Sequence, residues 1–213
     1  MKQQPIKKKT AVGSRELFSV KSLAVMALMA GVCCVLGPFT VPIGPVPVSF
    51  VMIGIYLAVY ALGVWRGTIA VVVYLLIGLF GLPVFSGFSG GPAKLFGPTG
   101  GYLIGYVFLA LICGYFIDRF PFRKWYLHLI GMVLGMVVCY AFGTAWFMIL
   151  MKMGLAESLT LCVFPFIPFD LIKILLCYGL GSAVRTGLAR AGLMVYPNHL
   201  SLDKKEANIL NEH

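Results

Sequence analysis

The stretch LIGMVLGMVVCYAFGTAWFMIL, residues 129–150, contains no charged side chain and decides the class of fold. A transmembrane helix needs about 20 mostly apolar residues, and this stretch is long enough. Similar runs recur along a chain that is 60% hydrophobic and only 11% charged, whereas soluble domains carry about 25% charged residues. Lipid admits only helices or closed barrels, and the runs lack the period-2 alternation of a barrel. The sequence therefore predicts an all-α integral membrane protein.

The apolar runs predict six transmembrane helices, over residues 22–37, 48–64, 67–81, 99–117, 126–150 and 168–188. This division leaves a basic N-terminal tail at 1–21, a membrane domain at 22–188 with a long loop at 82–98, and a C-terminal tail at 189–213. The first apolar run is followed by GPFTVPIGPVP and not by a small-residue cleavage site. We therefore interpret it as a retained helix and not as a signal peptide.

The basic residues predict how the chain is oriented in the membrane. With six helices, the tails and the turns after the second and fourth helices share one side, which holds Lys2, Lys7, Lys8, Lys9, Arg15, Arg66, Arg119, Arg123, Lys124, Arg190, Lys204 and Lys205. The other three connections hold only Lys94 and Lys152. The positive-inside rule then predicts cytoplasmic termini and an outer position for loop 82–98. This topology accounts for the net charge of +10 without a nucleic-acid partner.

One acidic residue, Asp170, lies inside a predicted span, and Lys173 follows three residues later. Ionisable groups in a span are costly and usually face the protein interior. At this spacing the two side chains share a helix face. Pro168 suits a first helical turn, which would place Asp170 near the positive end of the helix dipole. The pair either neutralises itself or binds a small polar ligand that offers both donors and acceptors.

Loop 82–98 contains Gly87-Phe88-Ser89-Gly90-Gly91, which matches the G-x-S-x-G pattern of serine hydrolases and resembles the G-x-S-G of rhomboid intramembrane proteases. Such an enzyme needs a histidine base. The apolar parts of the later helices contain none, and His128 is predicted at the cytoplasmic end of the fifth helix. We therefore expect no catalytic residue. The glycines instead permit tight turns and close approach to a ligand, or they form a compact re-entrant loop without one.

Neither a metal nor a nucleotide is expected in this chain. The six cysteines form no C-x-x-C and lie mostly within apolar runs, and no two of the three histidines have metal-ligand spacing on a helix. The phosphate-binding pattern G-x-x-x-x-G-K-[ST] does not occur either. The sequence therefore predicts no cofactor, and a chain of this kind cannot drive transport with ATP by itself.

Four motifs, PIGPVPVSF, GLPVFSGFSGG, GPTGGYLIGY and PFIPFDLIK, occur in this order between residues 22 and 188. Together they resemble BioY, the family of biotin-specific substrate-binding components (S components) of energy-coupling-factor transporters. The resemblance implies a six-helix bundle in a prokaryotic cell membrane that binds biotin from outside. It also implies a partner module, made of a membrane coupling protein and two ATPase subunits.

The resemblance also implies roles for individual residues. Asp170 and Lys173 match the family residues that contact the ureido ring of biotin. Lys94, in GGPAKLFG, lies where a basic loop residue can meet the biotin carboxylate. Loop 82–98 and the helix after it are expected to cover the ring and tail of biotin. The residues concerned are Phe85, Gly87, Phe88, Gly101 and Tyr102.

The first helix carries two small-xxx-small pairs, Ala27 with Gly31 and Ala30 with Cys34. Such pairs let another helix pack closely. The family uses a small-residue face of its first helix to dock the coupling protein, whereas spacing alone permits packing within the chain equally well. The main rival for the whole chain is a stand-alone secondary transporter in which Asp170 carries a proton.

Overall fold

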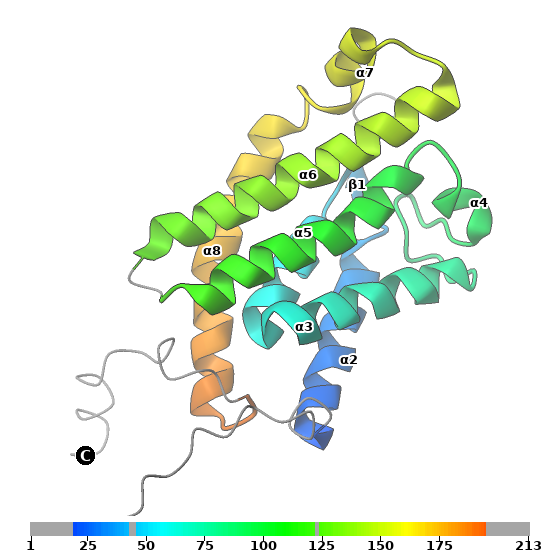
Figure 1. The fold of residues 1–213 in the computed structure, drawn as a ribbon. Coiled ribbons are helices and arrows are strands. Elements are labelled where there is room, and N and C mark those ends of the chain that lie inside the picture. Colours follow the sequence, from blue (N-terminus) through cyan, green and yellow to red (C-terminus); the bar gives the residue numbers. More distant parts are fainter. Residues whose placement is uncertain (1–18, 43–45, 122–123, 195–213) are drawn as a thin grey trace, which may run out of the picture.

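The computed structural model describes residues 19–42, 46–121 and 124–194, so most of the two predicted tails, residues 43–45 and residues 122–123 lie outside it. Within these ranges the chain is almost entirely helical (Figure 1). The long helices are α2 (Val20–Leu36), α3 (Val51–Leu79), α5 (Gly100–Arg119), α6 (Trp125–Met151) and α8 (Ile167–Arg190). Between them lie short elements that the sequence had not indicated: β1 (Thr40–Val41), β2 (Val48–Ser49), α4 (Pro92–Leu95) and α7 (Leu155–Cys162).

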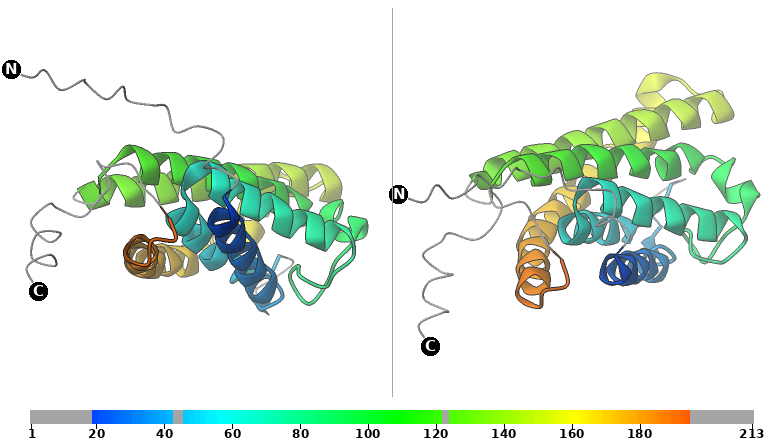
Figure 2. Two further views of the ribbon diagram at one scale, coloured as in Figure 1. Left: turned by 90° about the horizontal axis from the view of Figure 1, so that it is seen from below. Right: turned by 60° about the horizontal axis from the view of Figure 1, so that its bottom comes forward.

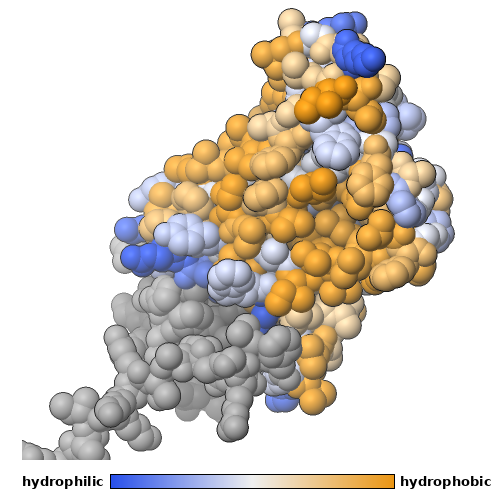
Figure 3. Space-filling model, turned by 45° about the vertical axis from the view of Figure 1, so that its right-hand side comes forward, coloured by the Kyte–Doolittle hydropathy of each residue, from blue (hydrophilic) through white to orange (hydrophobic). Residues whose placement is uncertain are grey.

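Four of the described helices, α3, α5, α6 and α8, are long and apolar enough to cross a membrane. The fifth long helix, α2, is equally apolar in character but has 17 residues. Hydrophobic side chains cover most of the face shown in Figure 3, where a soluble protein would carry charged groups. The prediction of a helical membrane protein is confirmed at this level.

Helix α3 is broken at Gly63, where φ is +78° and ψ is −176°. A glycine adopts this conformation without steric cost. A Cβ atom built on Gly67 would lie 2.9 Å from Cα of Val59, although residues eight apart in a straight helix are separated by about 12 Å. The chain therefore turns back at Gly63, and residues 64–79 pack against residues 51–62. The break lies three residues before Arg66, so the turn that we predicted around Arg66 was misplaced.

A polar cluster holds this turn in place. The backbone N–H of Val64 donates to Asp118 Oδ2 at 2.7 Å, so a carboxylate from α5 caps the second half of α3. The other oxygen, Oδ1, accepts from Arg185 Nη2 of α8 at 3.1 Å. Arg185 Nη1 also donates to the carbonyl of Tyr60 at 3.4 Å. The cluster thus joins three helices that are far apart in the sequence.

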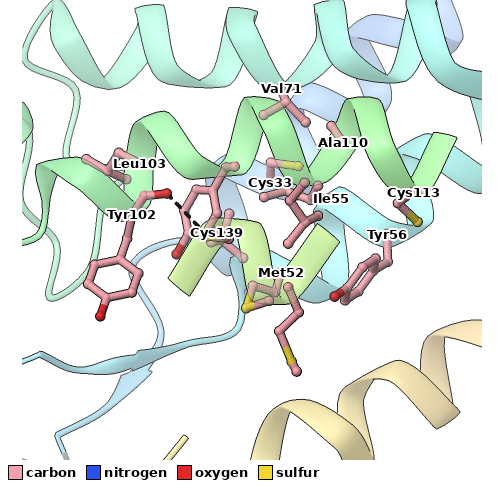
Figure 4. Close-up of a cluster of buried hydrophobic side chains, with 14 of the residues drawn as sticks. Cys33, Met52, Ile55, Tyr56, Val71, Tyr102, Leu103, Ala110, Cys113 and Cys139 are labelled. Atoms are coloured by element: carbon pink, nitrogen blue, oxygen red, sulfur yellow. Dashed lines mark hydrogen bonds between the residues drawn. The ribbon is translucent and has the colours of Figure 1, made fainter. Parts of the chain in front are cut away.

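Helices α5 and α6 lie side by side along most of their length (Figures 1 and 2). Small residues permit this approach. A Cβ atom on Gly105 would lie 3.0 Å from Cys139 Sγ, and one on Gly143 would lie 2.3 Å from the Tyr102 ring. The buried cluster between α2, α3, α5 and α6 includes Ile55, Tyr56 and Cys113 (Figure 4). This rigid core supports the end of the bundle at which α8 begins.

Several connections gather at that end of the bundle (Figure 1). Strands β1 and β2 pair antiparallel, with Thr40 opposite Ser49 and Val41 opposite Val48. Loop 82–98 packs beside them, because the N–H of Gly87 donates to the carbonyl of Pro38 at 3.1 Å. Gly87 has a φ of +72° and requires this freedom in the tight turn. The connections enclose the entrance to a cavity.

Candidate functional site

The cavity lies where β2, loop 82–98, α3, α5, α6 and α8 converge, and the empty space within it and in front of it, open solvent included, is about 600 Å³. The lining combines apolar side chains with polar and aromatic ones. The lining residues with a polar side-chain atom other than sulfur are Ser49, Tyr74, Ser86, Thr99, Tyr102, Tyr106, Tyr140, Asp170 and Lys173. A small ligand with several hydrogen-bonding groups fits this composition.

Asp170 and Lys173 form the polar centre of the cavity. Lys173 Nζ lies 2.7 Å from Asp170 Oδ1, and the two residues are only 3% and 5% exposed. Asp170 lies in the first turn of α8, after Pro168, where the helix dipole favours a carboxylate. The predicted pairing at a spacing of three residues is confirmed. Charges this deeply buried need further hydrogen bonds to offset the loss of water.

Two further groups supply these hydrogen bonds, and the sequence did not reveal either of them. Lys173 Nζ donates to the backbone carbonyl of Ser49 at 2.9 Å and lies 5.7 Å from the centre of the Phe50 ring. The hydroxyl of Tyr140 donates to Asp170 Oδ2. Tyr140 comes from the charge-free stretch of α6, and nothing in its spacing relates it to a residue thirty positions later. An ammonium has three donors, so Lys173 retains one for a ligand.

Tyrosines from two helices, α3 and α5, line the remaining wall. The Tyr74 hydroxyl donates to the carbonyl of Val84 at 3.3 Å, and the Tyr102 hydroxyl donates to the carbonyl of Cys162 at 3.1 Å. Tyr106 lies one turn further along α5 and also lines the cavity. Their rings present flat apolar faces, and the hydroxyls of Tyr74 and Tyr102 are satisfied by nearby backbone. Of the loop and α5 residues predicted to cover the ligand, Tyr102 is the one that lines this cavity.

The other predicted covering residues lie around the cavity and not in its lining. Phe85 belongs to loop 82–98, and its ring is fully buried. The ring meets Tyr74 of α3 edge to face, at 5.7 Å between centroids. Phe88 is 64% exposed and packs against Phe39. A Cβ atom on Gly101 would collide with Trp146, so Gly101 serves the contact between α5 and α6. These residues shape the loop and the helix packing around the cavity.

Lys94 lies in α4, is partly exposed and does not line the cavity in this conformation. Among the described residues, no carboxylate lies within ion-pair distance of its ammonium. Partial burial lowers the pKa of Lys94 below its ordinary value. Within the described ranges, the loop that contributes Ser86 to the cavity lining therefore also holds a cation without a counter-charge.

Ser89, the serine of the G-x-S-x-G pattern, donates its hydroxyl to the carbonyl of Ser86 at 2.7 Å within the loop. The two ring nitrogens of His128 lie 3.0 Å from the carbonyl of Phe120 and 3.4 Å from the Tyr60 hydroxyl. His128, the one histidine among the described residues, is thus engaged away from Ser89. This arrangement argues against serine hydrolysis at the loop.

The two small-residue pairs of α2 face different ways. Ala27 and Gly31 are exposed, and a Cβ atom on Gly31 would meet no atom within 4 Å. Ala30, in contrast, is buried against α3 in a cluster with Ala58 and Ala61. Cys34 is half-buried. The pair formed by Ala27 and Gly31 is therefore open to another helix, whereas Ala30 belongs to the internal packing.

Comparison with known proteins gives a consistent result. Residues 7–190 match the model of the BioY family. The chain is 37% identical over 135 residues to the biotin transporter BioY of Thermotoga maritima, covering 63% of this chain and 78% of the relative. It is 35% identical over 179 residues to the biotin transporter BioY of Rhizobium etli, covering 79% and 95%. A solved structure, the S component for biotin from an ECF-type ABC transporter, superposes with a TM-score of 0.73 at 32% identity, covering 82% and 95%.

Proposed function

Since the chain belongs to the BioY family, we propose that it binds biotin at the outer face of the membrane and passes it inward with an ATP-driven energy-coupling module. The observation that supports this function most directly is the buried pair of Asp170 and Lys173 at the wall of the cavity. Biotin carries two ureido N–H donors, a carbonyl acceptor, an apolar ring and tail, and a carboxylate. Asp170 accepts an N–H, and the remaining donor of Lys173 binds the ureido carbonyl.

The strength of these contacts is sufficient for tight binding. Hydrogen bonds to charged groups contribute about 1.5–3 kcal/mol each. Two or three of them, together with apolar burial against the tyrosine rings, can reach the roughly 12 kcal/mol of nanomolar affinity. The carboxylate of biotin then lies toward the opening, where Lys94 binds it as loop 82–98 closes. Phe85, Gly87 and Phe88 give that loop its shape.

The sequence has no G-x-x-x-x-G-K-[ST] motif, so ATP-driven movement of the ligand needs partner subunits. We assign this role to a membrane coupling protein and two ATPase subunits. The coupling protein docks on the exposed pair of Ala27 and Gly31, with Cys34 at the edge of the contact. Ala30 supports that face from inside. No enzyme activity is assigned to the chain.

The topology that fits this function has six membrane crossings in the cell membrane. They are α2, residues 51–62 and 64–79 of α3, α5, α6 and α8. The distribution of basic residues favours cytoplasmic termini, with the membrane domain between residues 22 and 188 and a tail at each end. In this orientation the cavity and loop 82–98 face outward.

Calorimetric titration of the purified full chain with biotin tests the assignment. We expect one tight site and a higher thermal midpoint with biotin, since a ligand at 100 times its dissociation constant adds about 2.7 kcal/mol to stability. Absence of binding in a folded preparation contradicts the proposal. The rival secondary transporter makes a different prediction, which is uptake into liposomes that hold this chain alone and carry only a proton gradient.

A further inference from the structure

The hydroxyl of Tyr140 occupies one oxygen of the Asp170 carboxylate, while Lys173 occupies the other. The two donors come from different helices, because Tyr140 lies on α6 and Lys173 on α8. Tyr140 is 8% exposed and lines the same cavity as its acceptor. A carboxylate has about four acceptor positions on its two oxygens, so two restraints fix its orientation and still leave positions for a ligand.

The surroundings make the Tyr140 hydroxyl difficult to replace. Behind its ring lies a second hollow, an apolar groove between α6, α7 and α8 that includes Val133, Met136, Leu159 and Leu171. Tyr140 also lines this groove, so its ring separates the polar cavity from an apolar space. Apart from Tyr140, the one lining residue of this groove with a hydroxyl is Thr144, and it makes no hydrogen bond to Asp170. Without the Tyr140 hydroxyl, the carboxylate would keep Lys173 and could turn about its side-chain bonds.

We propose that Tyr140 is the positioning residue of the site: it orients the Asp170 carboxylate toward the cavity and thereby sets selectivity for ligands that present N–H donors. This inference rests on the proposed function, since it takes the ureido group of biotin as the ligand group that Asp170 reads. It assigns the Tyr140 hydroxyl no direct contact with the ligand, because that hydroxyl is bound to Asp170. Preorganised acceptors bind more tightly because no ordering cost remains at the moment of binding.

The test combines three proteins with three ligands in calorimetric titrations of the full chain. The proteins are the wild type, Tyr140→Phe and Tyr56→Phe. Tyr56 is the matched control, because its buried hydroxyl donates to a backbone carbonyl, that of Met132, and lies outside the cavity lining. The ligands are biotin, biotin methylated at a ureido nitrogen, and biotin amide. The second ligand lacks an N–H donor, and the third changes only the far end of the molecule.

We expect Tyr140→Phe to weaken biotin binding about tenfold or more, as for the loss of a hydrogen bond to a charged group. Its preference for biotin over the methylated ligand should fall by a similar factor, while its preference for biotin over the amide stays as in the wild type. Tyr56→Phe should keep both preferences. A purely structural defect would weaken all three ligands equally.

Two results overturn the inference: unchanged discrimination in folded Tyr140→Phe, or equal loss of both preferences. If Tyr140→Phe does not fold, Tyr140→Met, which also lacks a donor, replaces it with the same expectations. A wild type that binds no biotin would refute the proposed function itself. A wild type that binds biotin, with a variant that discriminates equally well, refutes the role of Tyr140 alone.

Discussion

Asp170 and Lys173 are costly residues for a membrane protein, because each charge must leave water and then find partners within the bundle. The partners are a backbone carbonyl from β2 and a phenol from α6. The carbonyl accepts one hydrogen bond from Lys173, and the phenol donates one to Asp170. Other donor and acceptor positions of the two side chains stay open toward the cavity. At the scale of single residues, the site is therefore a buried ion pair with spare hydrogen-bonding capacity.

Replacing Asp170 with Asn keeps the shape of the side chain and removes its charge, which leaves the Lys173 ammonium without its ion-pair partner. Removing one partner of a buried pair costs about 3–5 kcal/mol, so biotin affinity should fall at least about a hundredfold. Calorimetry measures the affinity, and a thermal melt without ligand checks that the variant is folded. Unchanged affinity in a folded variant would refute the role of Asp170.

Lys94→Ala tests whether the Lys94 ammonium binds the biotin carboxylate. A partly desolvated charge pair couples by about 1–3 kcal/mol, so the wild type should prefer biotin over its amide by that amount and the variant should not. The bound carboxylate favours the charged ammonium, so the pKa of Lys94 is higher in the complex than in the free protein, where burial lowers it. The preference for biotin should be complete at a pH below the pKa of free Lys94. It should disappear as the pH rises through the pKa in the complex. Equal discrimination by both proteins would exclude this contact.

The sequence revealed the part of the site that lies on one helix and missed the part that other helices bring to it. Asp170 and Lys173 were found because two charges in an apolar run at a spacing of three residues stand out. Tyr140 was missed because a tyrosine in an apolar run is ordinary, and only packing of α6 against α8 gives it a partner. Phe85 was predicted to cover the ligand, but apolar character alone cannot separate the lining of a cavity from the core beneath a loop.

At the scale of elements, α3 shows how the sequence located two apolar segments and misjudged their junction. The segments were predicted to end around Arg66, the one charge between them. The turn instead falls at Gly63, because Asp118 of α5 supplies a cap for the N–H of Val64. That cap is 54 residues away in the chain, so no local pattern could indicate it.

Gly63→Ala should lower the thermal midpoint of the protein. An alanine would need a strained backbone at φ +78°, and its Cβ atom would lie 2.6 Å from Asp118 Oδ2. Strain of this kind costs about 1–3 kcal/mol. Gly187→Ala is the matched control, because Gly187 lies in α8 with nothing near its Cβ position and alanine favours helices. Equal midpoints for the two variants would show that the turn tolerates a side chain.

Gly31→Leu should separate ligand binding from transport. The position is open in the isolated chain, so the leucine fits there without disturbing the internal packing of α2. Biotin binding should survive, while ATP-driven uptake by the assembled transporter should be lost because two helices can no longer approach closely. Ala30→Leu is the opposing control, since Ala30 is buried and its enlargement should destabilise the chain itself. Loss of binding in Gly31→Leu would place this face inside the protein.

At the scale of the whole molecule, α8 contributes to an ion pair near each end, a fully buried one at Asp170 and Lys173 and a partly buried one at Arg185. Asp170 and Lys173 bind groups from β2 and α6, and Arg185 binds Asp118 of α5 and the carbonyl of Tyr60. Loop 82–98, in contrast, makes no ion pair among the described residues and is held by hydrogen bonds to its backbone and by the buried ring of Phe85. Motion on ligand binding should therefore concentrate in the loop.

Hydrogen exchange measured with and without biotin checks this division of the molecule. Amides of loop 82–98 should exchange markedly more slowly in the complex, because closure over the ligand removes them from solvent. Amides in the middle of α8 should change little. The opposite pattern, with protection concentrated in α8, would mean that the helix itself moves when biotin binds.

The contacts near its two ends also fix the rotation of α8 about its own axis. Lys173 and Arg185 lie about 18 Å apart along the helix axis, and each must point toward its own partner. Deleting one residue between them would rotate one anchor relative to the other by about 100°, so that either the ligand pair or the Asp118 contact would face the wrong way. The number of residues between Lys173 and Arg185 is thus set by the directions in which the two side chains must point, and not merely by the thickness of a membrane.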